Sequence, residues 1–135
     1  MAPIPEMEPQ NWQTVLATNL SSAFFAAKAQ LPAIEKRGGG PIVLTSIFVG
    51  LSNGGMPGMG AYAASKVGLI GMVQFLAIDH AAHRIRVNTI IPGGTKTAMA
   101  GDDPATHDFI ADLLPLKRMA NPKEIAQAAL FLLSD

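Results

Sequence analysis

Tyr62 and Lys66, in the segment Tyr-Ala-Ala-Ser-Lys, have the residue types and the spacing that best suit proton transfer in this sequence. In a helix, positions i and i+4 share one face, with Cβ atoms roughly 5–6 Å apart. A neighbouring ammonium favours the phenolate, so we expect it to lower the tyrosine pKa from about 10. A tyrosine tuned in this way can exchange a proton near neutral pH. Taken alone, such a pair more often marks an ordinary helix with one solvated lysine.

The segments before Tyr62 would place it beside the end of a buried strand. Residues 41–46 are short, continuously apolar and rich in β-branched side chains, which is typical of a buried parallel strand. Residues 47–60 are rich in glycine and indicate a loop. Because loops at the carboxyl ends of parallel strands commonly carry functional residues, we expect this loop to border the site.

Helical patterns account for much of the remaining sequence. Apolar residues recur at steps of three and four over residues 11–37, and Asn19 is a polar amide among them. Residues 61–82 predict a second helix that is apolar nearly all round. Residues 107–114 also have helical character within a longer loop.

The order of these segments predicts an α/β fold. Residues 84–91 indicate a second strand, and a last helix follows Pro122, with Asn121 as its N-cap and Glu124 completing a capping box. Strands that alternate with helices form a parallel sheet with right-handed crossovers. Because only two strands are found, we expect a partial, Rossmann-like doubly wound parallel sheet of about two strands and three to four helices, with open edges.

Composition excludes several classes of function. The 135 residues carry no net charge, so neither nucleic acid nor a membrane is an expected partner. There is no cysteine, and His80, His83 and His107 show no metal-ligand spacing, so no metal site is predicted. The first residues lack the features of a signal peptide, and the apolar run 67–78 is too short to span a bilayer. We therefore expect a cytoplasmic protein.

The apolar helix predicted at residues 61–82 needs a partner. One side can face the sheet, but a helix without a polar face must be covered on both sides. Gly68 and Gly71 would allow another helix to approach closely. We expect a homo-oligomer formed through the helices at about 11–37 and 61–82.

Together, these motifs resemble the second half of a short-chain dehydrogenase/reductase. The matching pieces follow the family's order and cover nearly the whole sequence: Trp12, Asn19, Leu20 and Phe24; Ile42 to Ser46; Tyr62 to Lys66 with Gly68; Ile85 to Asn88, then Pro92, Gly93 and Thr97; Leu116 to Met119; and Pro122 to Ala126, then Phe131 to Asp135. The resemblance implies that residues 1–135 are a partial catalytic domain, truncated at both ends. The family's Gly-rich turn, which binds the pyrophosphate, is absent from this sequence.

The resemblance also implies a reaction. Hydride would pass between NAD or NADP and a small-molecule carbonyl or alcohol, with Tyr62 as general acid or base. Lys66 would lower the pKa of Tyr62, and Asn19 would hold a water that links Lys66 to solvent. The residues lying along the cofactor would be Tyr62, Lys66, Pro92, Gly93, Thr95 and Thr97.

Two questions stay open in the sequence. The family's catalytic serine, which polarises the carbonyl, falls on Ser46 if its pairing with Thr45 sets the register, and on Ile47 if the following residues set it. Adjacent strand residues face opposite sides, so the register decides whether a hydroxyl reaches the site. We favour Ser46, and Ser52 is a further candidate. The alternative to an oxidoreductase is a truncated, catalytically inactive member of the family that serves as an oligomerising or interaction module.

Overall fold

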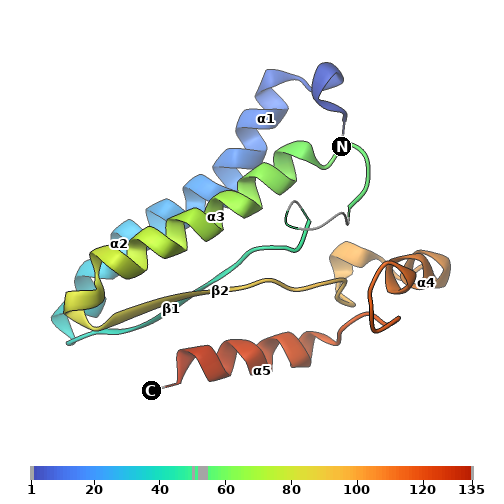
Figure 1. The fold of residues 1–135 in the computed structure, drawn as a ribbon. Coiled ribbons are helices and arrows are strands. Elements are labelled where there is room, and N and C mark those ends of the chain that lie inside the picture. Colours follow the sequence, from blue (N-terminus) through green and yellow to red (C-terminus); the bar gives the residue numbers. More distant parts are fainter. Residues whose placement is uncertain (1, 50, 52–54, 135) are drawn as a thin grey trace.

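The computed structural model describes residues 2–49, 51 and 55–134, and Figure 1 shows their arrangement. The helices are α1 (Pro9–Leu16), α2 (Ser22–Lys36), α3 (Gly60–Asp79), α4 (Pro104–Asp112) and α5 (Pro122–Leu133), and the strands are β1 (Gly40–Thr45) and β2 (Ile85–Ile90). Short 3-10 turns are η1 (Ile4–Glu6), η3 (Ala81–His83) and η4 (Ala98–Ala100), and a π-helical segment, η2 (Ala17–Ser21), joins α1 to α2. The predicted α/β fold is confirmed.

The two strands form a parallel sheet. β1 pairs with β2 in a register that runs from Gly40 opposite Ile85 to Thr45 opposite Ile90. Helices α2 and α3 cover one face of this pair, and α5 lies against the other face (Figure 1). The described residues therefore make a layered, partly doubly wound unit, as predicted.

The hydrophobic core lies between the sheet and the layer of α2 and α3. Its buried members are Ala27 and Leu31 from α2, Ile42 from β1, Val73 from α3, and Ile85 and Val87 from β2. Burial alternates along the start of β2, because Ile85 and Val87 face the core while Arg86 faces outward. This core fixes the orientation of α3, the helix whose first turn holds Tyr62.

The predicted helix at residues 11–37 is interrupted in a way that periodicity does not reveal. It begins at Pro9, widens into a π-helical turn over Ala17–Ser21, and then continues as α2 to Lys36. Pro32 lies inside α2 without ending it. Single π-helical turns occur often at functional sites, and this one contains Asn19.

Helix α3 is long and apolar enough to cross a membrane when only its length and composition are counted. This differs from the expectation based on its shorter apolar run at 67–78. Its buried residues Ala61, Ser65, Leu69 and Val73 recur every four positions, which forms one continuous buried face. We interpret α3 as the core helix of this α/β unit, since it packs on β2 and β1.

Candidate active site

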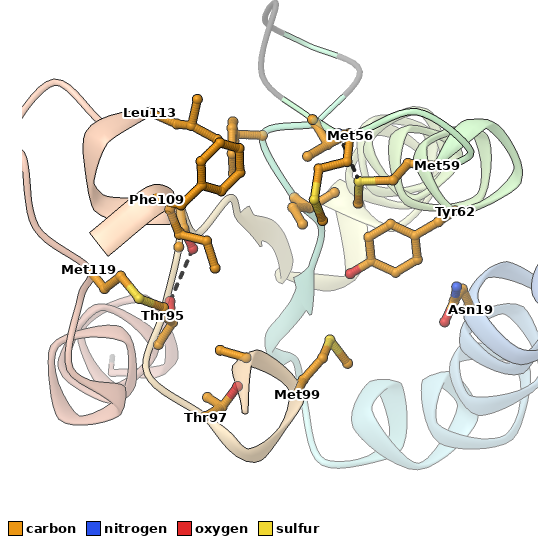
Figure 2. Close-up of a pocket in the computed structure, with 18 of the residues that line it drawn as sticks. Asn19, Met56, Met59, Tyr62, Thr95, Thr97, Met99, Phe109, Leu113 and Met119 are labelled. Atoms are coloured by element: carbon orange, nitrogen blue, oxygen red, sulfur yellow. Dashed lines mark hydrogen bonds between the residues drawn. The ribbon is translucent and has the colours of Figure 1, made fainter. Parts of the chain in front are cut away.

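Tyr62 stands in the first turn of α3 and faces a cavity of about 590 Å³. Figure 2 shows its ring directed from α3 into this cavity, with Met56 and Met59 nearby. Tyr62 also lines a second, adjoining cavity of about 520 Å³, together with Lys66. The predicted pair is thus brought to a hollow of the surface, where a small molecule has room to bind.

Lys66 lies one helical turn after Tyr62, as the spacing predicts, and is tied to the end of β1. Its Nζ donates a hydrogen bond to the Thr45 carbonyl oxygen at 3.0 Å. In the same place, the Ser46 hydroxyl donates to the Lys66 carbonyl oxygen at 2.6 Å. These two bonds join the end of β1 to the second turn of α3.

The expected direction of the Tyr62 pKa is wrong for this structure. Partial burial disfavours the phenolate and raises the pKa of Tyr62 above its ordinary value, and partial burial lowers the pKa of Lys66. The Lys66 ammonium is directed to the Thr45 carbonyl oxygen, and desolvation is the cause that decides the Tyr62 pKa. The hydroxyl of Tyr62 is therefore protonated at neutral pH, so it has a proton to donate.

Asn19 reaches the site through a residue that the sequence did not single out. The Asn19 amide nitrogen donates to the Ser65 hydroxyl at 3.1 Å, and that hydroxyl donates to the Tyr62 carbonyl oxygen at 2.7 Å. Ser65 has no exposed surface. The π-helical turn is thereby fastened to the first turn of α3, while Asn19 still lines the larger cavity. A signal for Ser65 was present, since it lies within the Tyr-Ala-Ala-Ser-Lys segment.

Ser46 and Ile47 follow β1 directly, and their surroundings differ. Ser46 is 3% exposed, and its hydroxyl proton is committed to the Lys66 carbonyl. Ile47 lines both cavities beside Tyr62. Of these two cavities, Ser46 lines only the smaller one. The further candidate, Ser52, lies outside the described residues.

The residues predicted along a cofactor gather on the segment that follows β2. Pro92, Gly93, Thr95 and Thr97 all line the smaller cavity, together with Tyr62 and Lys66. The Thr95 hydroxyl donates to the Gly93 carbonyl oxygen at 3.1 Å (Figure 2). Backbone bonds from Lys96 to Ala120 and from Ala120 to Gly94 hold this segment against the entry to α5. The segment after β2 and the start of α5, which are distant in the sequence, therefore form one wall of the smaller cavity.

The larger cavity is lined mainly by apolar side chains. Met99, Phe109 and Leu113, all from the stretch after Thr97, are among them. Leu114 is not among the lining residues, and it packs behind Gly93. The sequence did not identify Met56 and Met59 of the glycine-rich loop, Met119, or Val15 of α1 as lining residues. None of the described side chains that line this cavity carries a formal charge.

Comparison with known proteins gives consistent matches over most or all of the chain. The sequence profile of a family described as Enoyl-(Acyl carrier protein) reductase matches residues 1–135. The uncharacterized oxidoreductase YciK of Escherichia coli K12 is 42% identical over 121 residues, which are 86% of this chain and 47% of that protein. Cyclohexanol dehydrogenase of an Acinetobacter species is 34% identical over 130 residues, which are 96% of this chain and 50% of that protein.

A solved structure agrees with these sequence matches. The crystal structure of carveol dehydrogenase from Mycobacterium avium in complex with NAD superposes with a TM-score of 0.88 at 30% identity. The match covers 98% of this chain and 53% of that chain. The chain spans about half the length of the curated relatives it matches. These matches, and the order of its motifs, establish that the chain belongs to the short-chain dehydrogenase/reductase family of oxidoreductases.

Proposed function

We propose that this chain carries the proton-transfer site of a nicotinamide-dependent oxidoreductase that interconverts an alcohol and a carbonyl. The observation that carries the proposal is the position of Tyr62, which lines both cavities, with Lys66 beside it in the smaller one. Among the described residues lining the two cavities, Tyr62 and Lys66 are the ones with side chains that titrate. The chemistry of proton exchange is therefore confined to this pair.

The wall of the smaller cavity fits the nicotinamide half of a dinucleotide. Lys66 and Tyr62 offer donors suited to ribose hydroxyls, and Thr95 and Thr97 offer hydroxyls that suit a carboxamide. Gly93 contributes backbone without a side chain, so a flat ring can lie close to it. NAD or NADP would be held by these residues with Pro92, and when bound it would supply or accept the hydride.

The residues of the chain supply the proton and the orientation. In reduction, the Tyr62 hydroxyl donates its proton to the carbonyl oxygen of the substrate, and in oxidation the phenolate takes a proton from the alcohol. Asn19 and Ser65 hold the first turn of α3 in place, so the phenol keeps its direction. Because burial raises the pKa of Tyr62, the acid form prevails at neutral pH in the free chain.

The substrate class follows from the larger cavity. Four methionines, Phe109 and Leu113 surround the space that Tyr62 faces, and methionine side chains adapt to irregular apolar shapes. A charged substrate would lose its hydration there without gaining a partner. We therefore assign a neutral, apolar alcohol or ketone. The names of two relatives, cyclohexanol dehydrogenase and carveol dehydrogenase, support a cyclic secondary alcohol.

The alternative is a catalytically inactive interaction module, and one feature of the structure supports it. Phe25 of α2 and Phe75 and Ile78 of α3 expose more than half of their apolar surface, which another chain could cover. Calorimetric titration of the purified chain with NADH and then NADPH separates the two functions. Saturable binding that is weakened by Lys66→Met, and not by the matched surface variant Lys28→Met, supports the oxidoreductase. No binding up to millimolar cofactor would favour the module.

A further inference from the structure

Three side chains that commonly bind metals converge at the end of α3 that is remote from Tyr62. They are Glu35 in the last turn of α2, His80 directly after α3, and His83 in η3. The His80 Nδ1 lies 2.8 Å from the Glu35 Oε1, and the His83 Nδ1 lies 3.3 Å from the same oxygen. By the helical rise of 1.5 Å per residue, this cluster is about 27 Å from Tyr62 along α3. It is therefore separate from the proposed active site.

The distances within the cluster suit a small divalent ion. The one ligand atom from each residue lies within 4.8 Å of the other two. Zinc binds imidazole nitrogen and carboxylate oxygen at roughly 2.0–2.2 Å, so neighbouring ligand atoms of a tetrahedral site lie about 3.3–3.5 Å apart. The 3.3 Å between the His83 Nδ1 and the Glu35 Oε1 has that spacing, whereas the 2.8 Å between the His80 Nδ1 and the same oxygen would have to open by about 0.5 Å to admit an ion.

The backbone holds the three residues in place before any ion binds. The Gly38 amide donates to the Glu35 carbonyl oxygen at 2.9 Å, which closes the end of α2. The His80 carbonyl oxygen accepts from the amides of His83 at 3.0 Å and Ile85 at 3.3 Å. Both histidines are thereby fixed in one tight turn at the entry to β2. A preorganised ligand set lowers the cost of ordering on binding.

The surroundings leave room for a further ligand. The side chain of His80 is 21% exposed and that of Glu35 34%, while that of His83 is 55% exposed. The cluster is thus backed by protein on one side and open to water on the other, so an ion can enter and keep a water ligand. Two imidazoles with one carboxylate form a donor set that favours zinc and its first-row neighbours over magnesium or calcium.

We propose that Glu35, His80 and His83 form a binding site for a divalent ion of the zinc class. The ion would join the last turn of α2 to the turn between α3 and β2, where both helices lead into the sheet. Its role would be to stabilise this corner of the fold, because the site is far from Tyr62. The sequence did not predict the site, since Glu35 lies 45 residues before His80 and only the fold brings them together.

The test is a calorimetric titration of the untagged chain with zinc chloride, followed by NMR of the histidine rings. The chain has three histidines, so His107, whose ring bonds to the Gly101 carbonyl oxygen, is an internal control. We expect one equivalent to bind, the ring signals of His80 and His83 to shift, and that of His107 to stay. Glu35→Gln and His83→Asn should raise the Kd at least about tenfold, and His107→Asn should not.

Thermal unfolding gives an independent readout. Zinc at saturation should raise the Tm of the wild-type chain by at least about 5 °C, because the ion binds the folded state preferentially. Absence of zinc uptake, or uptake that moves the His107 signal and leaves those of His80 and His83 in place, would overturn the proposal and leave only the hydrogen bond between Glu35 and His80. If circular dichroism shows that a variant does not fold, the shifts of the His80, His83 and His107 ring signals in the wild-type chain decide whether the site binds zinc. None of these readouts depends on cofactor binding or on oxidoreductase activity.

Discussion

At the scale of single residues, Tyr62 and Lys66 show how burial changes the meaning of a sequence pattern. Their spacing places them on one face of α3, and a cation near a phenol is expected to lower its pKa. Here the Lys66 ammonium is hydrogen-bonded to the Thr45 carbonyl, and burial raises the pKa of Tyr62. The free site is therefore prepared to donate a proton rather than to accept one.

This direction predicts the pH dependence of the reaction. Because the raised pKa of Tyr62 keeps its hydroxyl protonated well above neutrality, carbonyl reduction should be nearly constant from about pH 6 to 9. Alcohol oxidation needs the phenolate, so its rate should rise with pH over the same range. Initial rates in both directions across a series of buffers measure this. A reduction rate that halves near pH 7 would show that the pKa is lowered instead.

Substitution should change the reaction rate at position 47 and the stability at position 46. Ile47 lines both cavities beside Tyr62 without a hydroxyl to offer a substrate oxygen. Ile47→Ser should therefore raise the rate of reduction by at least about tenfold, since it adds a donor at a developing charge. Steady-state kinetics on matched preparations measure this.

Ser46→Ala is the matched variant for that comparison. The Ser46 hydroxyl is buried and donates to the Lys66 carbonyl, so its loss should cost about 1–2 kcal/mol of stability. The rate per folded molecule should change little. A large fall in rate for Ser46→Ala, with no gain for Ile47→Ser, would restore Ser46 as the residue that polarises the carbonyl.

At the scale of elements, the turn from α2 into β1 depends on Gly39. Its φ is +113°, and an added Cβ would lie 2.5 Å from the Arg84 carbonyl oxygen and 2.8 Å from that of His83. These are backbone atoms, so they cannot rotate away. Gly39→Ala should destabilise the fold by at least about 2 kcal/mol, measured by urea unfolding.

Gly38→Ala is the control for the same turn. Gly38 also has a positive φ, of +95°, but its Cβ would meet nothing within 4 Å among the described residues. The cost should be only that of the left-handed backbone, about 1–2 kcal/mol. Equal losses for the two variants would mean that strain in φ alone, and not the contact with Arg84 and His83, makes glycine necessary at position 39.

Much of the element order could be predicted because its signals are local. Both strands were predicted to within one residue at each end, from short β-branched runs, and the capping box of Asn121 and Glu124 is present as expected. The π-helical turn was not predicted. Leu20 packs against Gly68 there and Asn19 bonds to Ser65, so contacts with a distant helix favour the extra residue in that turn.

The residues of the candidate site can be divided in the same way, into those with a local signal in the sequence and those without one. Tyr62 and Lys66 were predictable because they lie four positions apart in one helix, and Thr95 and Thr97 because the resemblance to the family indicated them. The direction of the Tyr62 pKa, the different surroundings of Ile47 and Ser46, and the meeting of Glu35 with two histidines all depend on packing between segments far apart in sequence. No single-segment pattern contains that information.

At the scale of the whole molecule, apolar side chains remain on the surface of α2 and α3. Phe25 is 63% exposed, Phe75 66% and Ile78 69%. Gly68 is already covered by Leu20 of the same chain, whereas a Cβ on Gly71 would meet no atom of the described part of the chain within 4 Å. The surface left for a second copy therefore lies around Gly71 and Phe75 rather than at Gly68.

We predict that this surface forms a homo-oligomer. Light scattering at micromolar concentration should give at least twice the 14.1 kDa mass of one chain. Phe75→Lys should shift the population towards the monomer, because it places a charge in the apolar contact. The matched variant Gln74→Lys adds the same charge at the neighbouring position. It indicates whether an added charge by itself shifts the population from oligomer to monomer. A wild-type chain that stays monomeric would contradict the prediction.

The central claim, that Tyr62 exchanges the proton in a nicotinamide-dependent reaction, is tested most directly by one comparison. Oxidation of a neutral cyclic secondary alcohol is followed by the absorbance of the reduced cofactor, for the wild-type chain and for Tyr62→Phe. We expect the wild type to turn over and the variant to lose at least about 10²-fold in rate while cofactor binding is retained. A Phe variant as active as the wild type would contradict the claim.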